Sequence, residues 1–284
     1  MERTAVAFAP GHISGYFRRV DGGTPATTGS CGAGCVIDRG VCATVTAATA
    51  TTVTITDTLP EGDRIIRYGS ALIEELLESL GVSARVETVA GMPIGAGFGM
   101  SAAAILATLT ATNAVFALGM NPAEIAAAAH AAEVSHNTGL GDVAAAAGGG
   151  VVIRNGPGLA GVRRRMFPDT VFWAVTFGSI FTPDVIGSPE QMRRVTAAFP
   201  GIEPHTVIEF VQASREFAEA SGLIPAEIRP VLHACDLAGV PASMTMLGRG
   251  VFAAGPAAGA VLRRFGAAVP LKIYPAGPVL LEVR

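Results

Sequence analysis

Three segments of the chain carry residue types that could bind or transfer a phosphoryl group. Residues 93–99 carry glycine at every second position from Gly95 to Gly99 and run directly into an apolar stretch that begins at about Ser101. Glu133 lies in an alanine-rich segment between two histidines, and Asp142 ends the short run Gly-Leu-Gly-Asp. A backbone loop for an anion, a hydroxyl and two carboxylates together match the groups that phosphoryl transfer needs.

The glycine-rich segment predicts an anion site. Backbone without side chains can close around phosphate oxygens, and the first free N–H groups of a following helix point towards them. A tight strand-to-helix turn with Ser101 as a helix cap is the structural alternative. If the segment binds nucleotide phosphates, we expect the contacts to come from Pro93, Gly95, Ala96, Gly97, Phe98, Gly99, Met100, Ser101 and Ala102.

The scarcity of lysine excludes two common kinds of phosphate site. Of the 20 cationic residues, 19 are arginine and Lys272 is the only lysine. A Walker A loop and a protein kinase each need a lysine near the glycine loop. A dinucleotide-binding fold would need an acidic residue about 20 positions further on, after a second strand. Asn121-Pro122 begins a helix there instead, so we discount that fold.

The two carboxylates each have a functional and a structural interpretation. An unpaired Glu133 inside an apolar helix would be costly unless a cation compensates it, and its oxygens together with Ser101 suit Mg²⁺. Glu133 could instead face solvent, or share a zinc site with His130 and His136, although the spacing differs from that of zinc proteases. Asp142 could orient or deprotonate a substrate hydroxyl, or simply cap a helix.

Composition favours a globular protein that binds a small molecule. Half of the 284 residues are hydrophobic, 15% are charged and the net charge is −3, unlike a nucleic-acid binder. The apolar stretch 102–120 contains several threonines and Asn113, so we expect a buried helix and no membrane span. The first residues lack the pattern of a signal peptide, which predicts a cytoplasmic protein. The run Arg163–Arg165 predicts a solvated face.

Strand and helix patterns alternate without regular βαβ units, which predicts an α+β fold. The patterns predict strands at 5–8, ending at Pro10-Gly11, and at 82–89, and either one long bent strand or a hairpin at 41–56. Helices are expected at 72–80, 101–118 and 122–136. Residues 155–158 (Asn-Gly-Pro-Gly) predict a boundary between domains at 1–158 and 159–284.

These three segments resemble the motifs of the GHMP kinases, in the family's order. Residues 93–103 are similar to its phosphate loop, with Met100 in place of the first of two serines. Ser101 and Glu133 match its Mg²⁺ ligands, and residues 139–142 followed by Gly148-Gly149 match the segment of its catalytic aspartate. The resemblance implies a ribosomal-protein-S5-like N-terminal domain, a ferredoxin-like C-terminal domain, and ATP and Mg²⁺ as cofactors, with Asp142 catalytic.

Within that family, residues 9–17 and 29–34 resemble the archaeal branch that phosphorylates pantoate. This implies transfer from ATP to the 4-hydroxyl of pantoate in coenzyme A biosynthesis, with Ser14 near the acceptor and a homodimer as a family-level expectation. His12 could contact the acceptor or a phosphate, or it could be a capped or core histidine. Pantoate is a carboxylate, so an arginine should bind it. We favour Arg154 over Arg18, Arg19, Arg39 and Arg249.

Two alternatives follow from the same resemblance. The chain could be another GHMP kinase, acting on mevalonate, homoserine or shikimate, or a nucleotide-binding protein of this fold without turnover. The family's third motif is a glycine-rich loop, and residues 243–250 retain little of it. We therefore expect weaker phosphate contact from that side.

Overall fold

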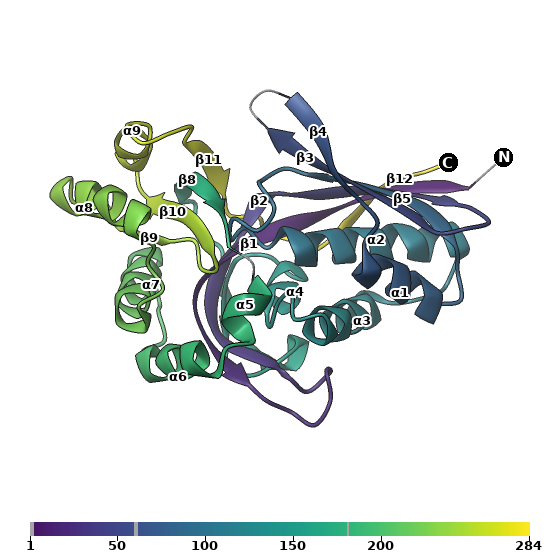
Figure 1. Cartoon of the computed structure of the whole chain (residues 1–284), viewed down its shortest axis with the longest axis horizontal. Coiled ribbons are helices and arrows are strands. Elements are labelled where there is room, and N and C mark those ends of the chain that lie inside the picture. The colour runs from purple at the N-terminus through teal and green to yellow at the C-terminus, as the bar shows by residue number, and fades with distance from the viewer. Residues whose placement is uncertain (1–2, 60–61, 181) are drawn as a thin grey trace.

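The computed structural model describes residues 3–59, 62–180 and 182–284, which form two sheets with helices packed on them (Figure 1). In the larger sheet the strand order is β12-β1-β2-β5-β3-β4, and β6 and β7 extend it from β2. Its strands are β1 (Thr4–Val20), β2 (Gly29–Ala47), β3 (Thr52–Leu59), β4 (Gly62–Tyr68), β5 (Ala84–Ala90), β6 (Val151–Arg154), β7 (Val162–Met166) and β12 (Val279–Val283).

The first strand is longer than its sequence pattern predicts. The expected end at Pro10-Gly11 is wrong, because β1 continues to Val20 with a register shift between Pro10 and Gly11. Proline lacks an N–H donor, and a bulge is one of the places where a strand accommodates it. The continuation matters for function because it carries His12, Ser14 and Phe17 across the centre of the molecule.

Residues 41–56 form neither one bent strand nor a hairpin. They belong to β2 and β3, which are separated in the sheet by β5. Strand β5 pairs antiparallel with β2 and parallel with β3. Local alternation indicates strands here, but the strand inserted between them, β5, comes later in the chain, after β4 and α1.

Four helices belong to this first sheet: α1 (Ala71–Ser79), α2 (Met100–Phe116), α3 (Pro122–Ser135) and α4 (Asp142–Ala146). Helix α2 is buried along most of its length and packs on β1 and β2, as expected for the apolar stretch. Helix α3 packs on α2 and begins with a capping box between Asn121 and Glu124. Both helices lie where the sequence predicts them.

The second sheet has the order β11-β8-β10-β9, formed by β8 (Val171–Ser179), β9 (Ala242–Met244), β10 (Gly248–Ala254) and β11 (Val269–Lys272). Its helices are α5 (Thr182–Ile186), α6 (Pro189–Ala198), α7 (Val207–Ser221), α8 (Arg229–Leu237) and α9 (Ala258–Leu262). Phe172, Phe210 and Phe252 are fully buried in its core, where Phe252 stacks on Phe210 and makes a tilted ring contact with Phe172. The predicted α+β class is confirmed.

The second part of the chain also contributes to the first sheet. Strand β7 pairs with β6, and β12 returns to pair with β1, so both chain ends lie at the same side of the molecule (Figure 1). The division into domains 1–158 and 159–284 stays a prediction. Among the described residues, no helix is long and apolar enough to cross a membrane.

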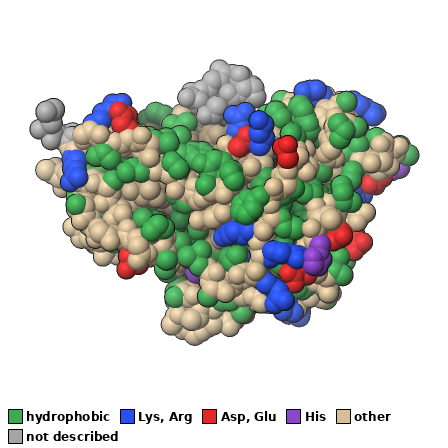
Figure 2. All heavy atoms as spheres, turned by 180° about the vertical axis from the view of Figure 1, so that it is seen from behind, with side chains coloured by type: hydrophobic (Ala, Val, Ile, Leu, Met, Phe, Trp, Pro, Cys, Tyr) green, Lys and Arg blue, Asp and Glu red, His purple; other side chains and the backbone are tan. Residues whose placement is uncertain are grey.

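Charged side chains are dispersed over the face seen in Figure 2. Lysine and arginine side chains lie beside aspartate and glutamate there instead of forming one continuous basic surface. Within the run of three arginines, Arg163 and Arg164 both pair with Glu203, at 3.2 and 3.5 Å. Arg165 differs from its neighbours, because its guanidinium donates hydrogen bonds to the backbone carbonyls of Ala144, Ala145 and Gly149. The solvated-face expectation is therefore wrong for Arg165.

Candidate active site

The glycine loop, residues 93–99, is held between two other parts of the chain. Gly97 and Gly99 have φ angles of 85° and 66°, in the region that favours glycine. A Cβ on Gly97 would lie 2.9 Å from the Met246 carbonyl oxygen, and one on Gly99 would lie 3.0 Å from the backbone of His12. The loop therefore needs glycine both for its conformation and for close contact with β1 and with the turn at 245–248.

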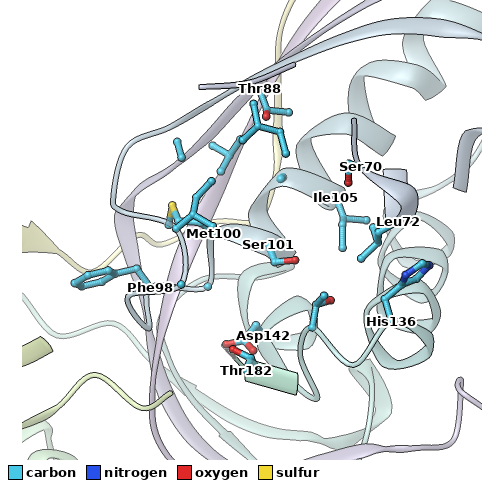
Figure 3. Close-up of a pocket in the computed structure, with 18 of the residues that line it drawn as sticks. Ser70, Leu72, Thr88, Phe98, Met100, Ser101, Ile105, His136, Asp142 and Thr182 are labelled. Carbon is cyan, nitrogen blue, oxygen red and sulfur yellow. The ribbon is translucent and has the colours of Figure 1, made fainter. Parts of the chain in front are cut away.

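Gly99 is the N-cap of α2, and no side chain caps that helix. The interpretation of Ser101 as a helix cap is therefore wrong. Its side chain instead lines a cavity of about 410 Å³ at the start of the helix, and Figure 3 shows Ser101, Asp142 and His136 around the same space. The backbone N–H groups of the first helical turn are available to an anion there.

Six of the nine predicted phosphate-binding residues line this cavity: Gly95, Gly97, Phe98, Gly99, Met100 and Ser101. Pro93, Ala96 and Ala102 are not among the residues that line it. Ala96 and Ala102 are fully buried, and the Ala96 carbonyl accepts a hydrogen bond from Thr245 Oγ1 at 2.9 Å. These two alanines belong to the packing that fixes the loop.

The cavity is also lined by residues that the sequence analysis did not assign to a phosphate or substrate site: Ser70, Leu72, Thr88, Ile105, His136, Thr138 and Thr182. Leu72 and Ile105 follow helical spacing, which predicts burial but not that the buried face borders a cavity. Thr138 directly precedes the segment of Asp142, and that proximity is the one signal that could have indicated it. His136 also pairs with Glu75 at 3.1 Å.

Asp142 lies at the first position of α4 and borders the cavity. Its Oδ1 accepts a hydrogen bond from His12 Nδ1 at 2.6 Å and one from Ser14 Oγ at 3.5 Å. Its side chain is 23% exposed, whereas that of His12 is 1% exposed. The N-cap of α4 is Gly141 without a side-chain cap, so the interpretation of Asp142 as a cap is wrong.

The surroundings of Asp142 keep its carboxylate ionised. Burial alone would raise its pKa, but the hydrogen bond from His12, the attraction of His12 and Arg154, and the bond from Ser14 together lower the pKa below its usual value. The ionised form is the one that can accept a hydrogen bond or proton from a hydroxyl. This arrangement suits an acceptor group for proton transfer.

Glu133 is buried, with 1% of its surface exposed, so the solvent-facing interpretation is wrong. Burial and repulsion from Asp142 raise its pKa well above the usual value, although Val143 N–H donates to the carboxylate. A Cβ on Gly139 would lie 2.5 Å from Oε1, while Oε2 has no hydrogen-bond partner among the described residues. A buried carboxylate with an unpaired oxygen fits a place for a cation.

The zinc arrangement is not formed. His130 Nε2 lies 2.9 Å from the Thr28 carbonyl oxygen, and His136 points to Glu75. In the described ranges, no group of three or more His, Cys, Asp or Glu side chains could hold a metal ion.

Arg154 lies behind Asp142, at the end of β6, and is 3% exposed. Its Nη1 donates hydrogen bonds to the Ser30 carbonyl oxygen at 2.7 Å and to Ser30 Oγ at 3.1 Å. A Cβ on Gly141 would lie 2.0 Å from Nη1, so the glycine gives the guanidinium its space. Arg154 does not line the larger cavity, but its partner Ser30 borders a second, smaller one.

The second cavity is small, about 20 Å³, and adjoins the first at Asp142. Ser14, Asp142 and Leu247 border both cavities. The remaining lining residues are Phe17, Ser30, Gly139, Leu140, Gly141 and Ile186. A carboxylate at the junction of a large and a small cavity can contact groups bound in both.

Comparison with known proteins agrees with this geometry. Residues 66–150 match the family described as the GHMP kinases N terminal domain. The chain is 46% identical over 286 residues to a pantoate kinase of Methanospirillum hungatei, covering 99% of this chain and 98% of that protein. It is 30% identical over 262 residues to a pantoate kinase of Methanocaldococcus jannaschii, covering 86% of this chain and 90% of that one.

Solved structures show the same fold over the whole length. A phosphotransferase related to the CoA biosynthesis pathway has a TM-score of 0.78 and 26% identity, covering 98% of each chain. A homoserine kinase from Cytophaga hutchinsonii has a TM-score of 0.67 and 17% identity, covering 98% of this chain and 97% of that one. The expected GHMP kinase fold is confirmed, and the chain belongs to the GHMP kinases, in the family of its pantoate kinase relatives.

Proposed function

We propose that this chain is an ATP-dependent pantoate kinase, which phosphorylates the 4-hydroxyl of pantoate to give 4-phosphopantoate in archaeal coenzyme A biosynthesis. The observation that carries the proposal is the position of Asp142, held by His12 at 2.6 Å where the two cavities meet. The identity of 46% over nearly the whole chain to a pantoate kinase supports the same acceptor.

In this proposal the glycine loop and the first turn of α2 bind the phosphates of ATP. Gly95, Gly97, Gly99 and Ser101 border the larger cavity and would contact the phosphates directly. Their backbone N–H groups, together with the positive end of the α2 dipole, would stabilise the charge that develops on the transferred group. No lysine beside the loop is required.

Ser101 and Glu133 fit the Mg²⁺ that the family implies. Both offer hard oxygen atoms, and the unpaired Glu133 Oε2 is a buried acceptor that a cation would compensate. When bound, Mg²⁺ would neutralise phosphate charge. Without a bound cation, burial and repulsion from Asp142 hold the pKa of Glu133 above its usual value.

Asp142 acts on the acceptor. Its carboxylate accepts the hydrogen bond of the 4-hydroxyl and can take the proton as the hydroxyl oxygen bonds to the γ-phosphorus. The bond from that phosphorus to the bridging oxygen breaks, and ADP leaves. His12 orients Asp142, and Ser14 is proposed to contact the acceptor. Arg154, which is hydrogen-bonded to Ser30, is proposed to attract the acceptor carboxylate through its positive charge.

The test is an ADP-release assay with pantoate, mevalonate, homoserine and shikimate as acceptors. We expect turnover with pantoate and a product phosphorylated at the 4-hydroxyl. Turnover with one of the other three instead would assign a different GHMP kinase. ATP binding without ADP release for any acceptor would indicate a nucleotide-binding protein without turnover. A cytoplasmic location and a homodimer stay predictions.

A further inference from the structure

Leu247 has a backbone conformation that its side chain disfavours. Its φ angle is 61°, in the left-handed region that glycine adopts readily and that costs a leucine free energy. Such a residue at the rim of a site points from the observed strain to a function for the side chain. A glycine would form the same turn without that cost.

The turn that holds Leu247 is fixed from several sides. Thr245 N donates to the Gly250 carbonyl at 2.9 Å, and Gly248 N donates to the Thr245 carbonyl at 3.0 Å. Thr245 Oγ1 reaches the glycine loop at Ala96, and Met246 N donates to the Ser14 carbonyl at 3.4 Å. The position of the Leu247 side chain is therefore set by the rest of the fold.

Leu247 borders both cavities, beside Asp142. Around the small cavity it is joined by three other apolar side chains, Phe17, Leu140 and Ile186, which are 4%, 5% and 3% exposed. We call these four residues the apolar wall. Ser14, Ser30 and Asp142 supply the polar side chains of the same cavity. The cavity therefore suits a group that is aliphatic but adjacent to a hydroxyl.

The size of the small cavity indicates which part of an acceptor it takes. A volume of about 20 Å³ admits one group of water or methyl size. The carbon next to the 4-hydroxymethyl group of pantoate carries two methyl groups. A methyl carbon is three bonds from the hydroxyl oxygen, so with the hydroxyl at Asp142 one of the two methyl groups can enter the small cavity. The rest of the acceptor then extends into the junction of the cavities.

We propose that Leu247 and Ile186, the two members of the apolar wall from the second part of the chain, determine specificity by contacting one methyl group of the acceptor. This inference rests on the proposed function and adds that the enzyme recognises the methyl substitution of its acceptor. Burial of that methyl group against apolar carbon favours pantoate over an acceptor that lacks it.

The experiment compares kcat/KM for pantoate with kcat/KM for 2,4-dihydroxybutanoate, which lacks both methyl groups. For the wild type we expect a preference for pantoate of about 10- to 200-fold, the range for a methylene-sized difference in an apolar pocket. Ile186→Ala and Leu247→Gly should each reduce that ratio by roughly tenfold or more. In both variants the ratio should fall mainly because kcat/KM for pantoate decreases.

Ala117→Gly is the matched control. Ala117 is exposed at the end of α2 and has a φ angle of 51°, so glycine relieves the same kind of strain away from the cavities. The ratio should equal that of the wild type in this variant. Circular dichroism and thermal melting would show that each variant folds, and Leu247→Gly tests the wall even if Ile186→Ala does not fold.

Two results would overturn the proposal, and they differ from failure of the proposed function. A wild type that uses both acceptors equally, or variants that keep the wild-type ratio, would remove the role of the wall while leaving pantoate kinase activity in place. A wild type that releases no ADP with either acceptor would overturn the proposed function itself.

Discussion

At the scale of single residues, the site depends on how each carboxylate is surrounded. Asp142 accepts hydrogen bonds from His12 and Ser14, and its pKa is lowered. Glu133 has an unpaired oxygen, and its pKa is raised. Two neighbouring carboxylates with opposite shifts suit different roles, one as an acceptor for a proton and one as a partner for a cation.

Asp142→Ala should lower kcat by roughly 10²- to 10⁴-fold or more, because it removes the group that accepts the hydroxyl proton. Binding of an ATP analogue, measured by fluorescence, should change little, since the glycine loop is intact. Near-normal turnover in this variant would contradict the catalytic role of Asp142.

His12→Gln should move the acid limb of the kcat/KM profile to higher pH. The active form of Asp142 is ionised and its pKa lies below the usual value, so wild-type activity should persist to low pH and fall only as pH drops through that lowered pKa. Removing the imidazole removes a main cause of the lowering. A pH–rate profile measured on a variant that melts as a folded protein checks this, and an unmoved limb would show that His12 does not orient the carboxylate.

Ser101→Ala should raise the KM for Mg²⁺–ATP several-fold or more while the melting temperature stays close to that of the wild type. The side chain lines the cavity and does not cap α2, so its loss costs the helix little. A Mg²⁺ titration at fixed ATP measures the effect. A lower melting temperature with unchanged kinetics would assign Ser101 a structural role only.

At the scale of elements, short helix α4 must present Asp142 although it has only five residues. Isolated helices of that length are unstable, so tertiary contacts must hold it. Arg165 does so by donating to the carbonyls of Ala144 and Ala145 at 2.8 Å and of Gly149 at 2.6 Å. The arginine satisfies the last carbonyls of α4 and joins β7 to the helix.

Arg165→Met should therefore destabilise the fold by about 1.5–3 kcal/mol, the range for a hydrogen bond to a charged group. It should also lower kcat, because α4 loses its C-terminal anchor. Arg163→Ala is the control: its side chain is 59% exposed and pairs with Glu203 on the surface, so we expect a change below about 1 kcal/mol. Equal melting curves for the two variants would contradict the anchoring role.

The elements also show what a sequence pattern can predict. Helices α2 and α3 follow from local signals, an apolar run after a glycine loop and an Asn-Pro start, and both lie where expected. The full length of strand β1 does not follow from local signals, because its continuation past Pro10 depends on a long partner strand, β2. Hydrogen-bond partners of strands are distant in sequence, and no local periodicity specifies them.

At the scale of the whole molecule, the site is assembled from both parts of the chain. Ser101 and Asp142 were predictable because each lies within a compact motif, and both border the cavity. The contacts of Ile186 and Leu247 could not be predicted, because they depend on how the second sheet packs against the glycine loop. Sequence therefore predicts the reactive groups better than the walls that select a substrate.

The last strand has a consequence for how the chain could be rearranged. Thr4 and Arg284 exchange backbone hydrogen bonds at 3.1 and 2.8 Å, so the two ends meet on one sheet edge. A short flexible linker could join them, and new termini could be opened in the exposed tip at residues 21–27. We expect such a circular permutant to fold and keep its kinase activity. Deleting residues 279–284 would instead remove β12, one of the two strands that pair with β1, and should reduce stability.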